Sequence, residues 1–461
     1  MNFWNEEKLK EAIGNNIKTY NFPEDWSSSG LAIWHKSCDF KKGNIILMRE
    51  AKEARGVLLS HLPKLVDECS AIMTTKAVNY FKYNKPIIEL KRNIGEEIIN
   101  MARYIRKIYT GKVIAITGSS GKSTTTKLIA DILSSKYKTN SNIESKTNTT
   151  WGISWNMTQF DINSDYWIIE TSLGGGMNRN SAITKPDCAI ITNVAPVHLA
   201  GDMQLKDIAE EKSRIFNSMH DGQTAILYNE MNYFEVVLEA AKSKNLKVIT
   251  FGENEQADIR IICDDEHKFI IKGQEYNLNK TVGKHIMLDM AAAIAVALEE
   301  NFKMEEILEI LKNFKTLEGR GEDFDFVFEN GKKVTVVDES YNANPLSMNA
   351  AITAFGKNFP DRNKILILGD MAECGTESER YHREISIPVD NIHPTKVLLC
   401  GKEIMALYEE IKDRYETKIY DNVMTLYAEL PEILADGDCI MLKASHSTNL
   451  HKIIEKMKEN G

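Results

Sequence analysis

The stretch Val113-Ile-Ala-Ile-Thr-Gly-Ser-Ser-Gly-Lys-Ser-Thr-Thr-Thr126 decides the fold, because it combines a buried strand, a glycine turn and the start of a helix. Gly118 and Gly121 permit a tight turn whose backbone N–H groups can face a polyphosphate. Lys122 supplies a positive charge for the β- and γ-phosphates, and the Ser123 hydroxyl can ligate Mg²⁺. The stretch therefore predicts a site for a nucleoside triphosphate.

This loop is shorter than the general phosphate-binding pattern G-x-x-x-x-G-K-[ST], because only Ser119 and Ser120 separate its glycines. An ordinary glycine turn before a helix is the alternative explanation. The loop also leaves the reaction open, because kinases, GTPases and ATP-dependent ligases all use such loops.

Length and composition are those of a globular, multidomain protein. The chain has 461 residues, enough for about three domains of ordinary size, with hydrophobic and charged contents of 43% and 27%. The formal net charge of −9 argues against a nucleic-acid surface, which needs a basic face. We therefore expect no nucleic-acid partner.

The cysteines and the N-terminus predict a cytoplasmic protein. The seven cysteines are scattered, odd in number and without C-x-x-C spacing, so we expect free thiols rather than disulfides or zinc ligands. The first residues lack a basic segment followed by an apolar one. No run of about 18 apolar residues occurs, so no membrane span is expected.

Three regions differ in pattern and predict an α/β protein of three domains. Residues 1–110 mix short strand-like runs with a helix near 94–108 and suggest a small domain. Residues 111–317 alternate apolar strands with helices, which predicts βαβ units and a mainly parallel sheet. Residues 318–461 form a third α/β region.

The apolar runs also predict individual strands. In the central region we expect strands at 113–117, 166–170, 188–192, 224–228 and 248–251. Short antiparallel strands are expected over 259–278, followed by a buried, alanine-rich helix over 285–300. In the third region we expect strands at 334–338, 364–368, 396–400 and 439–442.

Polar side chains follow two strands of the predicted central sheet. Glu170 ends one strand, and Asn193 and His198 follow another. Ligands of open α/β sheets bind at the carboxyl ends of strands, so we expect these side chains near the loop. A carboxylate there is suited to Mg²⁺. The alternative without a functional role is that Glu170 is a solvent-exposed carboxylate and His198 a structural histidine.

Two further segments are ambiguous from their residues alone. Lys212 lies in a helical run whose composition favours an exposed lysine. Asp338 ends the first strand expected for the third region and leads into a turn that includes Tyr341, Asn342 and Asn344. That turn can contact a ligand through its amide and hydroxyl groups, or it can be a plain turn capped by Ser347.

In this order, the motifs resemble those of the Mur ligases, the ATP-dependent amide-forming enzymes of peptidoglycan synthesis. The matching segments lie within about residues 112–455, at 117–124, 192–198, 211–216, 283–285, 338–345, 368–373 with His382, and 437–438 with 443–445. Tyr-Asn-Ala-Asn-Pro and Leu-Gly-Asp-Met resemble the MurF branch, whose members add D-alanyl-D-alanine to a UDP-N-acetylmuramoyl tripeptide. The resemblance implies a small N-terminal α/β domain, a central P-loop parallel-sheet ATPase domain and a C-terminal Rossmann-like α/β domain.

The resemblance also implies roles for single residues. The catalytic residues would be Lys122, Glu170, His198 and Lys212. The nucleotide would contact Gly118, Ser119, Ser120, Gly121, Lys122, Ser123, Thr124, Asn193, His285, Asp289, Arg320 and Asp338. Two Mg²⁺ ions would be held by Ser123, Glu170, His198 and Lys212, the last as a carbamylated lysine. The substrates would contact Asn148, Thr149, Tyr341, Asn342, Asn344, Lys443 and Ser445.

The implied reaction joins a small-molecule carboxylate to an amine, which is an amino acid or a dipeptide. The carboxylate attacks the γ-phosphate of ATP, giving an acyl phosphate and ADP, and the amine then displaces phosphate. Lys122 and Mg²⁺ would offset the repulsion between the anions, and closure of the third domain would exclude water. We expect a monomer or a weak dimer.

Departures from the family pattern fall at the substrate ends. The first domain has His35-Lys-Ser-Cys-Asp-Phe-Lys-Lys-Gly43 where an Asp-Ser-Arg turn is usual. The paired asparagines become Asn148-Thr149, Asp289 replaces an asparagine, and Lys-Gly-Ser-Arg becomes Lys443-Ala-Ser-His446. These changes favour a divergent MurF-like ligase for another acid and amine. Two different classes of protein also stay open: a P-loop ATPase or kinase with a regulatory C-terminal domain, and an inactive scaffold.

Overall fold

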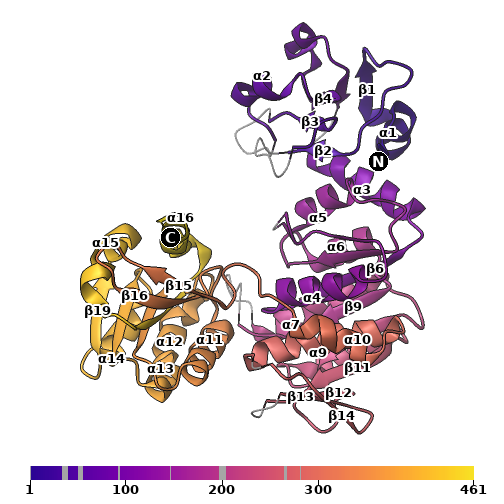
Figure 1. Ribbon diagram of the computed structural model, residues 1–461. Helices are drawn as coiled ribbons and strands as arrows, with labels where there is room; N and C mark the ends of the chain where they lie inside the picture. The colour runs from indigo at the N-terminus through magenta and orange to yellow at the C-terminus, as the bar shows by residue number, and fades with distance from the viewer. Residues whose placement is uncertain are drawn as a thin grey trace.

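Three β-sheets of five, nine and six strands organise the chain from its N-terminus to its C-terminus (Figure 1). The computed structural model describes residues 2–33, 40–49, 56–91, 94–145, 147–196, 204–263, 267–280 and 282–460. The sheet changes between residues 90 and 112 and again between 277 and 322, and these intervals contain the predicted domain boundaries. The boundaries themselves stay a prediction. No helix among the described residues is long and apolar enough to span a bilayer.

The first sheet is small and lies at the top of Figure 1. Its strands are β1 (Ile17–Tyr20), β2 (Leu31–Ala32), β3 (Ile45–Leu47), β4 (Ala71–Thr74) and β5 (Ile87–Leu90), in the order β1-β5-β4-β3-β2. The β1–β5 pair is antiparallel and the other pairs are parallel. The accompanying helices are α1 (Glu6–Ile13) and α2 (Leu62–Leu65).

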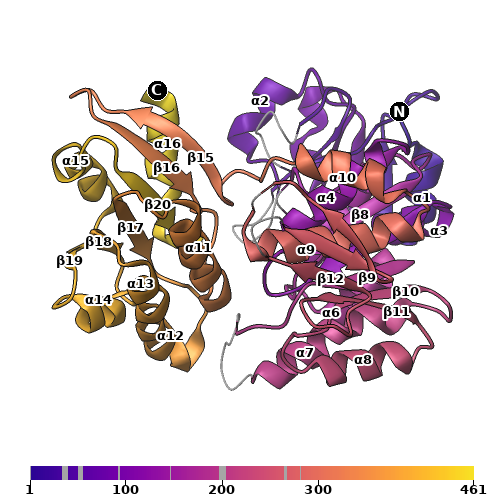
Figure 2. The same cartoon turned by 60° about the horizontal axis from the view of Figure 1, so that its bottom comes forward.

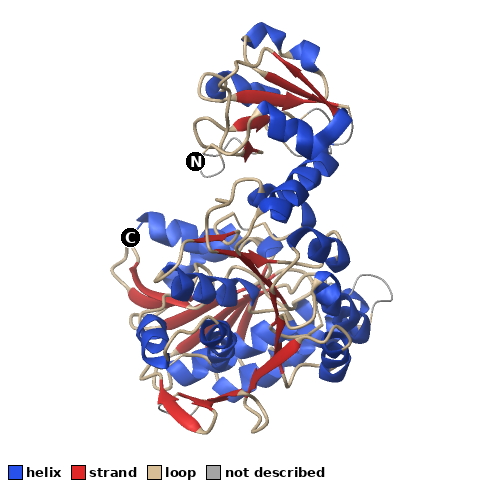
Figure 3. Ribbon diagram, turned by 90° about the vertical axis from the view of Figure 1, so that its right-hand side faces the viewer, coloured by secondary structure: helices blue, strands red, loops and turns tan. Residues whose placement is uncertain are grey.

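Helix α3 (Ile94–Ile108), which the sequence predicted, joins the first sheet to the second (Figure 3). Its apolar face packs in one core with residues of the first sheet and of the central region. Two indole N–H groups also cross between these parts: Trp4 donates to the Thr158 carbonyl at 2.9 Å, and Trp155 to the Leu31 carbonyl at 2.6 Å. The first domain is therefore fixed to the central one by shared packing as well as by the helix.

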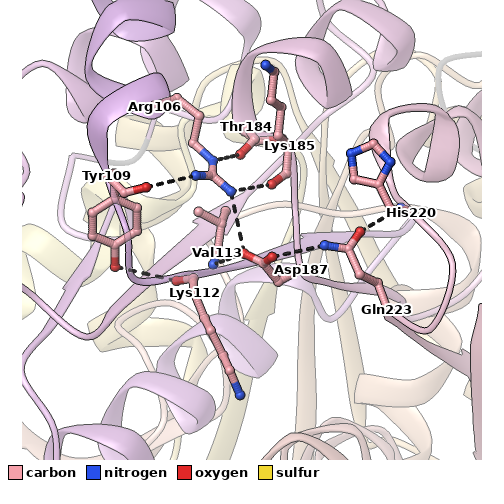
Figure 4. Close-up of polar contacts among 9 residues, drawn as sticks. All are labelled: Arg106, Tyr109, Lys112, Val113, Thr184, Lys185, Asp187, His220 and Gln223. Carbon is pink, nitrogen blue, oxygen red and sulfur yellow. Dashed lines mark hydrogen bonds and ion pairs between the residues drawn. The ribbon is translucent and has the colours of Figure 1, made fainter.

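Arg106, near the end of α3, reinforces this connection where the central strands begin (Figure 4). Its guanidinium donates to the Thr184 and Lys185 carbonyl oxygens at 2.7 and 2.8 Å. Asp187 lies beside it and accepts from the Val113 N–H at 2.9 Å, at the start of the central sheet. One arginine thus ties the connecting helix to the beginnings of the central strands.

The central sheet has nine strands and is mainly parallel, as predicted. The strands are β6 (Lys112–Thr117), β7 (Thr139–Ser141), β8 (Tyr166–Glu170), β9 (Cys188–Ile191), β10 (Thr224–Tyr228), β11 (Lys247–Gly252), β12 (Ile259–Ile262), β13 (Lys268–Ile271) and β14 (Gln274–Asn277). Their order is β14-β13-β12-β11-β10-β9-β6-β8-β7, and only the β12–β13 and β13–β14 pairs are antiparallel. The chain therefore reverses direction across the sheet at β6, where open α/β sheets bind ligands.

Helices cover both faces of this sheet (Figure 2). They are α4 (Lys122–Ser134), α5 (Thr150–Met157), α6 (Met177–Thr184), α7 (Leu205–Ser213), α8 (Phe234–Lys242), α9 (Lys284–Glu299) and α10 (Met304–Lys312). Helices α4, α9 and α10 bury one face, and α5 and α6 with α3, then α7 and α8, bury the other. Alternate residues of β8 show this, because Ile168 packs with α4 and its neighbours whereas Trp167 and Ile169 pack with α3 and α5.

The third sheet has the strands β15 (Glu322–Val327), β16 (Lys333–Asp338), β17 (Lys364–Gly369), β18 (Lys396–Cys400), β19 (Glu416–Tyr420) and β20 (Cys439–Lys443). Their order is β15-β16-β20-β17-β18-β19, and only β15 is antiparallel to its neighbour. The helices are α11 (Pro345–Asn358), α12 (Ser378–Glu384), α13 (Ser386–Ile392), α14 (Met405–Ile411), α15 (Val423–Ile433) and α16 (His451–Asn460). Helices α11 to α14 cover one face, and α15 and α16 the other.

The three-domain α/β architecture is thus confirmed, but the sequence missed several strands. The strands β7, β15 and β19 were not predicted, nor were β1, β2, β4 and β5 of the first sheet. The sequence had suggested that Asp338 ends the first strand of the third region, but because β15 precedes it, Asp338 ends the second strand, β16. The missed β15 has polar residues at alternate positions because it is an edge strand, so it lacked the apolar run that marked the others.

Candidate active site

The glycine loop lies between β6 and α4, as the sequence predicted. Gly118 and Gly121 have φ angles of 155° and 78°. A Cβ atom would collide with the Thr192 hydroxyl at Gly118 and with the Asp289 carboxyl at Gly121. Only glycine satisfies both the backbone angles and the close packing, so these two glycines are required by the conformation of the loop and do not simply make it flexible.

Asn193 holds the loop in shape. Its Oδ1 accepts from the backbone N–H groups of both Ser119 and Ser120 at 2.9 Å. Its Nδ2 donates to the Ser120 hydroxyl at 2.6 Å. Thr192 adds a hydrogen bond from its hydroxyl to the Ser120 carbonyl at 2.5 Å. The predicted nucleotide residue Asn193 therefore acts here on the loop itself.

Ser123, in the first turn of α4, contacts Glu170, the last residue of β8. The Ser123 hydroxyl donates to Glu170 Oε2 at 2.6 Å, and Asn148 Nδ2 donates to Oε1 at 2.6 Å. Asn142 fixes the backbone of Glu170 through two hydrogen bonds of 2.8 and 3.0 Å. The sequence did not single out Asn142, because it follows the short strand β7, which carried no apolar signal.

Lys122 points back at its own loop and donates to the Gly118 carbonyl at 2.9 Å. Burial lowers the pKa of Lys122, and the nearby Glu170 carboxylate opposes that change. The ammonium thus spans the space that the loop encloses, where an anion would meet it.

Arg320, on the linker between the second and third sheets, reaches the loop from the other domain. Its Nη2 donates to the Ser123 hydroxyl at 3.0 Å. Its guanidinium lies 4.3 Å from the centre of the Tyr341 ring, a cation–π distance. Asn344 Nδ2 also approaches the Ser119 carbonyl, at 3.5 Å. Linker and third-domain residues therefore meet the phosphate loop of the second domain.

Lys212 is not the exposed lysine that composition suggested. Its side chain is 1% exposed, and its amine has no hydrogen bond or ion pair among the described residues. Burial lowers the pKa of Lys212 well below its usual range, and the positive charge of Lys122 lowers it further. Burial without an opposite charge therefore favours the neutral form of this amine.

The turn after β16 is internally satisfied. Asp338 is buried, and its Oδ1 accepts from the backbone N–H and the hydroxyl of Ser340, at 3.0 and 2.6 Å. Burial raises the pKa of Asp338. Asn344 is the N-cap of α11, where it exchanges hydrogen bonds with Ser347. The cap is thus Asn344, and Ser347 lies three residues into the helix.

Other predicted substrate residues at this edge also have internal partners. Lys443 is 3.2 Å from Glu339 in a buried ion pair and donates to the Asn342 carbonyl at 3.1 Å. The Ser445 hydroxyl accepts from the Ala372 N–H at 2.7 Å. The sequence did not identify Glu339, because it is far from Lys443 in the chain and only the fold brings the two side chains together.

The Leu368-Gly-Asp-Met motif and His382 serve the fold. Asp370 accepts from the backbone N–H groups of Lys402 and Ile404, at 3.0 and 2.8 Å. The buried His382 accepts from the Met371 N–H at its Nε2, at 2.9 Å, and its Nδ1 lies 2.7 Å from the Ser378 carbonyl. Both side chains therefore brace the loop that follows β17.

The remaining predicted residues are less close to the loop. His285, in the first turn of α9, has a pKa lowered by burial. Its ring lies beside Gly283, which also approaches Ala354 of the third domain. Thr149 is the N-cap of α5, without a side-chain capping bond, and Asn342 is exposed. His198 falls outside the described residues.

The donor set of the loop fits Mg²⁺. Ser123 and Glu170 offer a hydroxyl and a carboxylate oxygen 2.6 Å apart, and Mg²⁺ is bound through one or two carboxylates together with phosphate oxygens and water. No group of three or more His, Cys, Asp or Glu side chains among the described residues could hold a metal by itself. A metal here would therefore need the phosphates of a nucleotide to complete its shell.

Comparisons with known proteins match the chain in two blocks. The family model described as Mur ligase middle domain matches residues 116–297. The model described as Mur ligase, glutamate ligase domain matches residues 324–446. The first block contains the phosphate loop, Glu170 and Lys212, and the second contains the turn after β16.

Similar proteins extend over the whole chain. The UDP-N-acetylmuramoyl-tripeptide–D-alanyl-D-alanine ligase of Rickettsia prowazekii is 25% identical over 463 residues, which cover 98% of this chain and 99% of the relative. The crystal structure of MurF from Acinetobacter baumannii has a TM-score of 0.80 at 20% identity and covers 99% of both chains. MurF from Thermotoga maritima, solved in complex with ADP, has a TM-score of 0.73 at 20% identity and covers 93% of this chain and 97% of that one.

Proposed function

Because the chain belongs to the Mur ligase family and is a MurF-like, ATP-dependent, ADP-forming ligase, we propose that it joins a UDP-N-acetylmuramoyl tripeptide to D-alanyl-D-alanine. The family predicted from the motifs is confirmed. The observation that carries the proposal is the meeting of Arg320 and Asn344 with the phosphate loop, at Ser123 and Ser119. A site shared between domains suits an enzyme that must bring ATP to a second substrate.

Two competing functions are less well supported. A divergent ligase for another acid was suggested by the unusual first domain, yet the similarity to the rickettsial enzyme spans nearly all of both chains, the first domain included. An ATPase or kinase with a regulatory third domain does not account for the match of that domain to the Mur ligase model. We therefore propose the peptidoglycan substrates rather than other acids and amines.

The reaction would proceed in two steps. A carboxylate oxygen of the tripeptide attacks the γ-phosphorus, forming a P–O bond while the bond to the β,γ-bridging oxygen breaks and ADP leaves. The amine of the dipeptide then attacks the acyl carbon, forms the C–N bond, loses a proton and expels phosphate. Each step brings anions together, so catalysis depends on positive groups and donors at the transferred phosphoryl group.

The loop supplies those groups. The start of α4 has no side-chain cap, so its first backbone N–H groups can donate to phosphate. Lys122 would exchange its bond to the Gly118 carbonyl for a phosphate oxygen. Ser123 and Glu170 would hold Mg²⁺, which neutralises phosphate charge when bound. Arg320 now contacts the Ser123 hydroxyl, so we propose that it shifts onto the nucleotide when that hydroxyl turns to the metal.

Lys212 would provide a second acidic group. In its uncharged form, the amine can attack carbon dioxide, forming an N–C bond and releasing a proton to solvent, so that the side chain ends in a carbamate. The absence of any partner for Lys212 among the described residues, in a buried position, supports this proposal. We propose that the carbamate, with His198, holds a second Mg²⁺ ion. We further propose that the chain acts in the cytoplasm as a monomer or weak dimer.

The test is phosphate release from ATP by the purified protein, with the amide product followed by mass spectrometry. We expect release that requires both UDP-N-acetylmuramoyl tripeptide and D-alanyl-D-alanine, and loss of release in Lys122→Ala. Phosphate release that needs the tripeptide but accepts no dipeptide would overturn the proposed amine. If no phosphate is released with both substrates present while MgATP still binds, the proposed acid is wrong.

A further inference from the structure

Asp289 is a buried carboxyl at the nucleotide loop that the reaction above does not use. It lies in the second turn of α9, is 6% exposed, and packs against Gly121 so closely that no side chain would fit there. Its Oδ1 accepts from the Thr125 hydroxyl on α4 at 3.0 Å. That is its single hydrogen bond among the described residues, and it forms no ion pair with any of them.

A buried carboxylate is costly when it is not paired. The charged groups that act on Asp289 are Lys122, from α4, and Arg320, from the linker, and both favour the ionised form. Burial outweighs them and raises the pKa of Asp289 to about 8. Near neutral pH the side chain is therefore a carboxylic acid, with one oxygen facing Thr125 and a proton to donate from the other.

Resting on the nucleotide site of the proposed function, we propose that Asp289 binds the nucleotide as a neutral acid, so that nucleotide binding at alkaline pH takes up a proton from solvent. The phosphates of a nucleotide bring negative charge into the space beside Gly121. They also engage Lys122 and Arg320, the two cations that stabilise the ionised carboxyl. Both effects favour the protonated acid when the loop is filled.

A neutral acid resembles an amide in carrying a donor and an acceptor side by side, although the amide has two N–H donors and the acid a single O–H. The aspartate at this position, which the sequence marked as a departure from asparagine, is then a functional replacement below the pKa. Above the pKa the two side chains differ, because the carboxylate only accepts and carries a charge that repels phosphate.

Proton linkage sets the expected size of the effect. With a free-state pKa of about 8, binding should take up about half a proton at pH 8 and nearly one at pH 9. The affinity for the nucleotide should then fall about tenfold between pH 7 and pH 9. The sign follows because the bound state holds more protons than the free state, so raising the pH opposes binding.

The experiment is calorimetric titration of MgADP into the full-length protein at pH 7, 8 and 9. At each pH, two buffers of different ionisation enthalpy give the number of protons taken up. We expect uptake at pH 8–9 that largely disappears in the near-isosteric variant Asp289→Asn, which should bind MgADP about tenfold more tightly than the wild type at pH 9. The matched control Asp131→Asn, on the outer part of α4 where Asp131 pairs with Lys127, should behave like the wild type.

Two results would overturn the inference. One is the absence of proton uptake by the wild type, a measurement that needs no variant. The other is equal uptake by Asp289→Asn, which would assign the proton to another group, such as Lys212. Neither depends on ligation. A protein that binds MgADP without making the proposed amide still tests Asp289, and a protein that binds no nucleotide fails the proposed function instead.

Discussion

Removal of the Asn193 side chain should loosen the phosphate loop and weaken nucleotide binding. In Asn193→Ala, the N–H groups of Ser119 and Ser120 lose their 2.9 Å acceptor, and the Ser120 hydroxyl loses its 2.6 Å donor. At about 1 kcal/mol for each hydrogen bond, the loop loses up to about 3 kcal/mol of ordering energy. The Asn193 carbonyl, 3.2 Å from the Ser119 N–H, is retained and offsets part of this loss.

If only the ordered loop binds phosphate, about 2–3 kcal/mol corresponds to a loss of about 30- to 150-fold in MgADP affinity. The assay is calorimetric titration of MgADP, with thermal unfolding as a check on the fold. Asn178→Ala is the matched control, because Asn178 is exposed on the same domain and, within the part of the chain that the structure describes, its side chain bonds only to Asn217. An affinity within about threefold of the wild type would show that Asn193 does not organise the loop.

Three further predictions follow from single contacts. Lys212→Met should abolish ligation, yet without bicarbonate or Mg²⁺ it should raise the free energy of unfolding at pH 7. The pKa of Lys212 is lowered in the folded state, so below about pH 10 the native wild type binds fewer protons than its unfolded chain and loses stability. Urea titration should therefore show the gain of the variant fading towards pH 10. Arg106→Ala should destabilise the protein by about 2–4 kcal/mol through the lost bonds to the Thr184 and Lys185 carbonyls, whereas the exposed Arg103→Ala should change thermal unfolding little. Tyr341→Leu should weaken MgADP binding about two- to fivefold by removing the ring that holds Arg320, and Tyr341→Phe should keep the affinity.

The sequence was sufficient for the parts of the fold that carry strong local patterns. The strands β8, β10 and β18 match the predicted ranges residue for residue, because each is a buried parallel strand with a continuous apolar run. The short or polar edge strands β7, β15 and β19 escaped, because half or more of each lies outside the core. Strands of this kind are defined by their neighbours.

The candidate site divides in the same way. The phosphate loop was readable because its glycines, lysine and serine act through consecutive backbone positions. Lys212 could not be read from its residues, since composition gave an exposed lysine and only the packing of α7 against the sheet buries it. Composition reports what a helix contains, and burial depends on what the helix is packed against.

By itself, then, the sequence determined the nucleotide loop, the α/β class and the family, because these depend on residues that are adjacent in the chain or that recur at fixed spacings. Only the tertiary structure decided what the isolated polar residues do. In the folded chain, Asn193 bonds to the loop backbone, Glu339 pairs with Lys443, and Arg320 donates to Ser123. It left Asp289 buried beside the loop without an ion pair, among the described residues. The reason is that hydrogen bonding and the cost of burying charge depend on distances between segments far apart in the chain, which local patterns do not encode.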